Sequence, residues 1–231
     1  MRKCLAILAL VSAFVPTALA GKKTSLGALK TANYTSIIST KDQTPRFTFH
    51  APKGLNASHF IGGVTGVFMH AKAAERGSMI LSEYKVTEPA VDIAKALAGQ
   101  LGEELRLETD FRDSGIASSI AASHATLRSA KDLAEAYGPG RLVVNVGTFM
   151  WSVQGTGESK YRILYSARAQ IVDTTERGVV ASAECTFPFK RADSARDAAT
   201  MFDNDAESLK AELQEIVEYC TDKLKSEMLG A

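Results

Sequence analysis

Apolar and polar residues alternate most regularly between residues 141 and 189. Three runs, at 141–153, 160–173 and 177–189, are separated only by the short polar links QGTGES and TTE. In the middle run apolar residues occupy every second position, which is typical of a strand with one buried and one wet face. Links this short join antiparallel neighbours. The pattern predicts a three-stranded antiparallel meander, and the predicted buried face of its middle strand carries Tyr161, Ile163, Tyr165, Ala167, Ala169 and Ile171.

Two longer stretches have apolar residues at helical spacing. In residues 89–106 an apolar stripe runs through Ile93, Leu97, Leu101 and Leu105, and Pro89 stands where a first helical turn tolerates proline. In residues 206–229 a similar stripe runs through Ala206, Leu209, Leu213, Ile216, Cys220 and Leu224. A short helix is predicted at 129–138, where the GPG at 138–140 ends it.

Shorter apolar runs at 34–40, 46–50, 78–86 and 116–120 predict further strands, and Asp110 and Asp113 are expected in a turn. The fold class is therefore expected to be α/β (α+β). It would contain a mixed sheet whose C-terminal antiparallel three-stranded meander packs against two longer helices. Residues 21–231 are expected to form a single α/β domain, with 21–45 loosely ordered.

The first twenty residues have the layout of a secretory signal peptide. Arg2 and Lys3 precede an apolar run over 4–15, and Ala18-Leu19-Ala20 ends in a small-x-small pattern. A membrane anchor is the alternative, but the run is shorter than the roughly 20 residues that span a bilayer. We expect cleavage after Ala20 and a periplasmic or secreted protein.

Cys185 and Cys220 are the cysteines that remain after this cleavage. Export brings a chain into an oxidising space where thiols pair. Both cysteines fall on faces expected to be buried, because Cys185 shares its strand face with Val179, Ala181, Ala183 and Phe187 while Cys220 lies on the helical stripe. A helix packed on that sheet would bring them together, so a disulfide is predicted. The alternative is a pair of buried free thiols.

Charge and motif content exclude several functions. With 27 basic and 26 acidic residues the chain lacks the basic excess of a nucleic-acid binder. His50, His59, His70 and His124 are scattered without metal-ligand spacing, so neither a metal site nor a cofactor is expected. The GTGESK at 155–160 joins two predicted strands, which favours a hairpin loop over a phosphate loop. No catalytic residue is assigned.

One segment stands out as a candidate binding surface. Residues 60–69 read FIGGVTGVFM, and we interpret them as an apolar loop-like insert that is partly helical. Exposed, they would suit a protein partner or a membrane surface; the alternative is a loop packed in the core. The candidate partner-binding residues are Phe60, Ile61, Val64, Val67, Phe68 and Met69. Trp151, with Phe149, is expected on a buried sheet face.

The order of elements, with AYGPGRLVVNVGTF and IVDTTERGVVA as its matching parts, resembles a small α/β domain of bacterial envelope proteins. This domain type occurs in the N-terminal domain of TolB, the curli secretion channel and the outer-membrane activators of penicillin-binding proteins. The resemblance covers residues 78–228 and implies a periplasmic protein that binds other proteins or envelope components. The chain departs from these families in having no lipid-anchor cysteine after the apolar run and no propeller domain, so no particular partner carries over.

These observations lead to the hypothesis of an exported periplasmic accessory or binding protein without catalytic chemistry. A secreted hydrolase, with a site assembled from scattered residues, is the alternative from another class, and a host-directed secreted factor is a third. The oligomeric state is left open.

Overall fold

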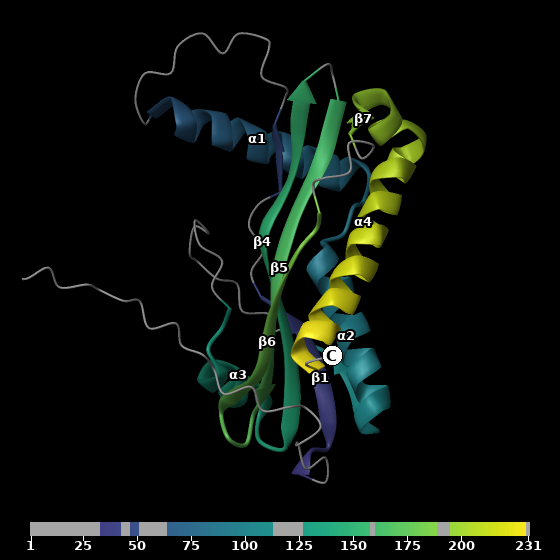
Figure 1. Cartoon of the computed structure of the whole chain (residues 1–231). Helices are drawn as coiled ribbons and strands as arrows, with labels where there is room; N and C mark the ends of the chain where they lie inside the picture. The colour runs from purple at the N-terminus through teal and green to yellow at the C-terminus, as the bar shows by residue number, and fades with distance from the viewer. Residues whose placement is uncertain are drawn as a thin grey trace, which may run out of the picture.

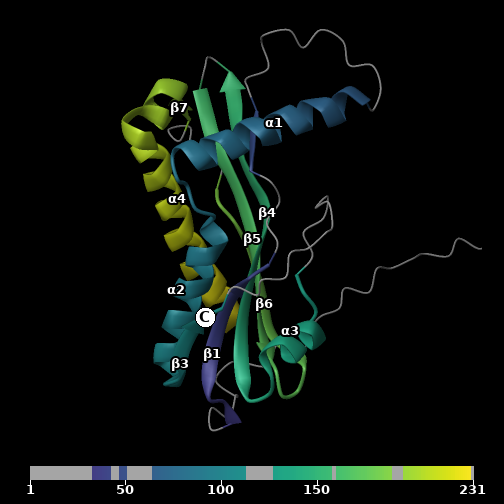
Figure 2. The same cartoon turned by 180° about the vertical axis from the view of Figure 1, so that it is seen from behind.

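A computed structural model describes residues 33–42, 47–50, 64–112, 127–157, 160–188 and 195–229, with the side chains of 64–72, 156, 196, 198 and 199 outside the description. These residues form a seven-stranded mixed sheet with helices on both faces. Figures 1 and 2 show the sheet from its two sides, with α2 and α4 along one face, α3 at the lower end of the other and α1 across the upper end.

The sheet combines a parallel half with an antiparallel half. Strand β1 (Ser36–Lys41) lies between β3 (Glu108–Phe111) and β4 (Arg141–Gly157) and is parallel to both. Strands β4, β5 (Lys160–Asp173) and β6 (Gly178–Thr186) follow as the predicted antiparallel meander. Strands β4 and β5 form a hairpin as expected, but β4 continues to Gly157, opposite Lys160, so residues 154–157 of the expected link belong to the strand.

Two short strands pair with the parts of β4 and β5 that extend past the ends of β1 and β6. Strand β2 (Thr48–His50) runs parallel to the far half of β4, and β7 (Arg196–Asp197) pairs with the start of β5. Both lie at the upper end of the molecule, where α1 and the start of α4 also meet (Figure 1).

The main core lies between the sheet and the two longer helices, as predicted. Helix α2 (Pro89–Leu105) and helix α4 (Ala198–Leu229) contact each other and the same face of the sheet. The predicted stripes are the buried ones, apart from half-buried Leu105, and the alternate residues of β5 from Ile163 to Ile171 join the same cluster. Trp151 also belongs to this core, which confirms the interpretation of that residue.

A smaller core occupies the opposite face. Helix α3 (Ala130–Tyr137) is capped by the Ser129 hydroxyl, which accepts a hydrogen bond from the Asp132 amide at 3.2 Å. Its buried residues Leu133 and Tyr137 pack in a five-membered cluster with Ile38, Val143 and Val172. The lower back of the sheet is therefore covered, and the pattern-based helix at 129–138 is confirmed.

Helix α1 (Val64–Glu83) corrects the prediction of a strand at 78–86. The apolar run there is short enough to suit either structure, but Ala73, Ala74 and Gly77 precede it at helical spacing on a buried face. Ile80 and Leu81 continue that face and pack against the main core. Residues 62–66 include three glycines, and because glycine disfavours helix, only a partly helical insert is expected there. The structure begins the helix at Val64.

Two further expectations require correction. Asp110 lies in β3 and not in a turn, because residues 108–111 pair in parallel with β1. Val179 is exposed although Cys185 on the same predicted strand face is buried. A register shift opposite Ile171 and Val172 explains the difference, since an extra residue in one strand turns the following side chains to the other face.

Candidate functional site

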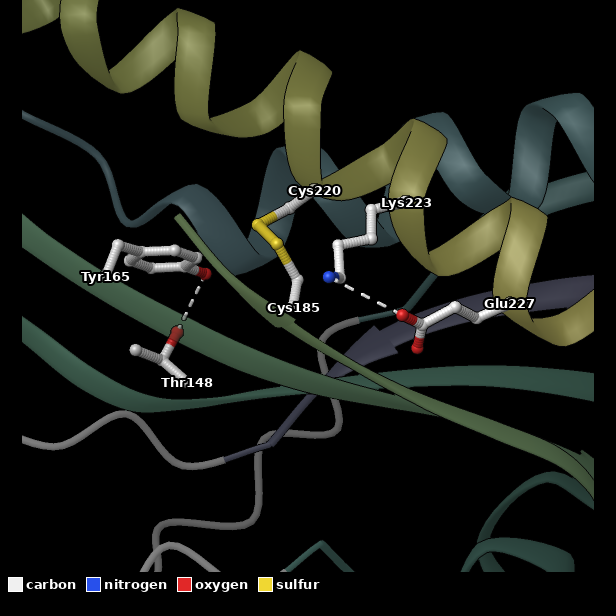
Figure 3. Close-up of a disulfide and its surroundings, with 6 residues drawn as sticks. All are labelled: Thr148, Tyr165, Cys185, Cys220, Lys223 and Glu227. Atoms are coloured by element: carbon white, nitrogen blue, oxygen red, sulfur yellow. Dashed lines mark hydrogen bonds and ion pairs between the residues drawn. A yellow bond between two sulfur atoms is a disulfide. The ribbon is translucent and has the colours of Figure 1, made fainter. Parts of the chain in front are cut away.

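The predicted pair of cysteines forms a disulfide inside the main core. Cys185 of β6 and Cys220 of α4 are both fully buried, with their Cα atoms 5.5 Å apart. Figure 3 shows the bond crossing from the strand to the helix, with the Lys223–Glu227 ion pair of 3.5 Å on the next turn of α4. The bridge ties the C-terminal helix to the edge strand of the meander.

The candidate partner-binding segment falls at the start of α1. Positions 64, 67, 68 and 69 form its first two turns, while Phe60 and Ile61 lie outside the described residues. Figures 1 and 2 both show this end of α1 extending away from the sheet, whereas the other end reaches the body of the molecule. The binding role of these residues stays a prediction.

The second half of α1 is attached to the body through close contact with the segment at β2. A Cβ added at Gly77 would lie 2.1 Å from the carbonyl oxygen of Phe47, so only glycine permits this approach. Phe47 in turn packs on Trp151 with ring centroids 4.8 Å apart. The attachment of α1 is therefore tight at Gly77 and is supported by a buried aromatic pair.

Four aromatic rings, which we call the aromatic junction, hold the end of α1 against the rest of the fold. Phe49 of β2 lies 5.0 Å from Tyr161 of β5 and 5.8 Å from Phe202 of α4, measured between ring centroids. Tyr84, directly after α1, lies 5.9 Å from Phe202. The junction thus connects α1, the β4–β5 hairpin and the start of α4.

The outer face of α1 exposes an apolar side chain. Met79 is 63% exposed, which makes it the most exposed large apolar residue among those described; Val179 at 49% and Tyr219 at 37% follow. A shallow surface hollow surrounds Met79 and is otherwise lined by Glu75, Ser78, Ser82 and Glu83. An exposed methionine with a polar rim offers an adaptable apolar contact to a partner.

A second hollow, of about 240 Å³, lies where the α1–α2 connection faces α4. Lys85 and Lys210 line it together with Asp92 and Gln214, and Leu213 and other apolar side chains form the remaining wall. Lys210 also forms an ion pair of 2.6 Å with exposed Asp205, whose pKa is lowered chiefly by that hydrogen bond. Of the charged side chains that line the hollow, Lys210 is therefore paired with a carboxylate just outside it.

A buried polar chain crosses the main core near the start of α2. The Thr148 hydroxyl donates to the Glu88 carboxylate at 3.0 Å, and it lies 3.1 Å from the Tyr165 hydroxyl (Figure 3). Because the single Thr148 proton is used on Glu88, Tyr165 is the donor of the second bond. Burial raises the Tyr165 pKa above its usual value of 10.0, so this phenol keeps its proton and remains a neutral hydrogen-bond donor. Lys41, 3.5 Å from Glu88, completes the chain.

A second polar network, which sequence reasoning missed, fixes the segment before α3 to the back of the sheet. The buried Asp42 carboxylate accepts from the Arg128 side chain at 2.7 Å, from the Arg128 amide at 2.6 Å and from the Asn145 amide at 2.7 Å. Tyr137 donates to Thr40 at 2.9 Å beside it. Asp42 is 86 residues from Arg128 and 103 from Asn145, so only the fold brings them together.

The remaining expectations about chemistry concern the histidines. The His50 ring lies 3.0 Å from the Thr48 hydroxyl, whereas His59, His124 and the side chain of His70 are outside the description. Within the described ranges no three His, Cys, Asp or Glu side chains come close enough to hold a metal ion. Within the same ranges, no helix is both long enough and apolar enough to cross a membrane.

Comparison with known proteins assigns no family. No family model and no curated protein matches the chain. Among solved structures, the hypothetical protein CT253 from Chlamydia trachomatis aligns over 85% of this chain and 99% of its own, with 7% identity and a TM-score of 0.38. Protein XCC0632 from Xanthomonas campestris, described by the family model DUF330, aligns over 82% and 85% with 12% identity and a TM-score of 0.33.

Lipoprotein GNA1162 from Neisseria meningitidis aligns over 81% of this chain and 98% of its own, with 14% identity and a TM-score of 0.28. These three are bacterial proteins, and one of them is a lipoprotein. They do not include the envelope families that the sequence resembles. Because all three TM-scores lie below 0.5, the likenesses carry no conclusion about the function of this chain.

Proposed function

We propose that this protein is an exported accessory protein of the bacterial envelope that binds a partner through the outer face of α1 and performs no catalysis. The observation that carries the proposal is the placement of α1: its second half is fastened at Gly77 and at the aromatic junction, while its first turns extend beyond the sheet. A helix held at one end and free along its outer face suits helix-mediated docking.

The residue pattern of α1 supports the same role. Met79 is exposed within a rim of Ser and Glu side chains. Position 68, a phenylalanine in the candidate segment, stands about three helical turns before Met79, so both positions lie on one side of the helix axis. Apolar residues on one side of a projecting helix are the anchors expected of a docking surface.

Export is supported by the buried disulfide together with the signal-peptide pattern of residues 1–20. Disulfides persist in oxidising compartments such as the periplasm and the extracellular space. The Cys185–Cys220 bond lies in the main core, where it contributes to the fold and is shielded from reductants in solution.

Site-specific photo-cross-linking in the native host tests the binding surface. A photoreactive phenylalanine analogue is placed at Met79, and at Val179 and Tyr219 as matched controls, because these are also exposed large apolar positions. We expect one discrete cross-linked partner from position 79 and none from the controls. Equal cross-linking at all three positions, or none at 79 when a control captures a partner, would reject α1 as the docking surface.

The identity of that partner also decides between destinations. An envelope component supports the accessory role, whereas a host protein supports the alternative of a host-directed factor. The secreted-hydrolase alternative stays a hypothesis. Its best candidate group is the chain of Glu88, Thr148 and Tyr165, of which Tyr165 belongs to the main core.

A further inference from the structure

Three consecutive residues in α4 have left-handed backbone conformations. Asn204, Asp205 and Ala206 have φ values of 50°, 58° and 56°, with ψ values of 53°, 35° and 36°. Residues other than glycine visit this region singly, because the Cβ crowds the following carbonyl oxygen. We call residues 204–206 the left-handed turn. It divides α4 into a short first piece and a long second piece, and it stores backbone strain.

Burial on both sides of the left-handed turn balances this strain. Met201 before it is fully buried, as are Ala206 within it and Leu209 after it. If residues 203–206 relaxed into the right-handed helix that surrounds them, the short first piece would follow the axis of the long piece. Met201 and Phe202 would then leave their present positions, and β7, which pairs with Lys160 and Tyr161 of β5, would be pulled from the sheet.

Residues in and just before the left-handed turn interact with the end of α1 in two ways. Phe202, just before the turn, packs on Tyr84 and Phe49 in the aromatic junction. Asp205, in the turn, is paired with Lys210 and also interacts electrostatically with Lys85. Lys85 itself has a left-handed φ of 52° and ends α1, since the Val86 amide donates to the Leu81 carbonyl across it.

We propose that the left-handed turn is a strained hinge that couples α4 to α1: its relaxation to right-handed helix withdraws Phe202 from the aromatic junction and loosens the attachment of α1. The hinge gives the projecting helix two states, one fastened and one released. The coupling is a property of the free protein, so it holds or fails independently of whether α1 binds a partner.

A matched pair of double variants isolates the backbone preference of the hinge. Asn204→Gly with Asp205→Gly relieves the strain, because glycine adopts positive φ without a Cβ clash. Asn204→Ala with Asp205→Ala increases it, because alanine favours the right-handed helix. Both pairs remove the same amide and the same carboxylate, including the ion pair to Lys210, so they differ only in backbone preference.

Hydrogen–deuterium exchange on the full processed chain measures the release of α1. Relative to the glycine pair, the alanine pair is expected to exchange the amides of residues 73–83 about tenfold faster, while α2 exchanges equally in both. Equal rates for α1 in the two variants would overturn the coupling. A parallel rise in α1 and α2 would also overturn it, because it would show general destabilisation.

A single substitution at the anchor gives an independent test if the alanine pair does not fold. Phe202→Leu keeps an apolar side chain of similar volume but removes the ring that packs on Tyr84 and Phe49. The same amides of α1 are expected to exchange faster than in the unmodified protein, with α2 unchanged. Unchanged protection of residues 73–83 in Phe202→Leu would overturn the proposed role of Phe202.

Discussion

Removing the disulfide should cost a large part of the stability of the fold. The informative variant replaces both Cys185 and Cys220 by alanine, because serine would bury two hydroxyl groups and add their desolvation to the result. The two cysteines are separated by 35 residues. Closing a loop of that length lowers the entropy of the unfolded chain enough to stabilise the fold by about 4 kcal/mol.

Urea unfolding followed by circular dichroism measures this loss. With an m-value of about 2 kcal/mol/M, the midpoint of the double variant is expected about 2 M below that of the oxidised protein. The unmodified protein unfolded under strong reductant should give nearly the same low midpoint. Val179→Ala, a truncation on the same strand but at an exposed position, serves as the control and should leave the midpoint within experimental error.

A loss below about 1 kcal/mol in the double variant would refute the reasoning, because the main effect of the bond is on the unfolded chain. Such a result would mean that the two sulfurs are not joined in the folded protein, or that the unfolded chain is already constrained between these positions.

Other substitutions and pH changes test separate contacts. Gly77→Ala should destabilise the fold by about 1–3 kcal/mol, since its Cβ would lie 2.1 Å from a backbone oxygen, whereas Gly99→Ala in the open interior of α2 should stabilise it by about 0.5–1 kcal/mol; thermal unfolding compares the two. Asp42→Ala should cost about 3–5 kcal/mol in the same assay, because it leaves a mostly buried arginine unpaired, and a cost near zero would contradict the network. The pKa values of Tyr34 and Tyr165 are raised above 10.0, chiefly by burial, so the stability that depends on their neutral phenols is complete below pH 10 and is lost as the pH rises further. Ultraviolet titration should show the fully buried Tyr165 ionising only as the fold opens, and ionisation of all six tyrosines in the folded state would contradict this.

The parts of the fold that could be predicted are those with a local period. The alternation along β5 and the stripe from Leu209 to Leu224 in α4 each give one buried face, and both faces are buried in the structure. The disulfide could be predicted because Cys185 and Cys220 lie on those two faces. Helix α1 could not, because its glycines weaken the helical signal and its apolar run at 78–86 suits a strand as well.

The parts that could not be predicted depend on contacts between distant residues. Strand β3 has mostly exposed residues without alternation, and its position is set by pairing with β1. The network around Asp42 joins three segments that are distant in the sequence: the end of β1, the segment before α3, and β4. The left-handed turn is favoured locally by Asn204 and Asp205, but Ala206 has no such tendency and is held there by burial.

The proposed export into an oxidising compartment would keep the disulfide oxidised, and the proposed binding role in the envelope depends on it. Intact-mass analysis of the protein isolated from its native host without reductant tests this most directly. The predicted result is a chain that begins at Gly21 and takes up no thiol-alkylating reagent until it is unfolded and reduced, when Cys185 and Cys220 each become modified. The export proposal would be contradicted by a chain that keeps residues 1–20 and whose two cysteines are both alkylated once the protein is unfolded without reductant.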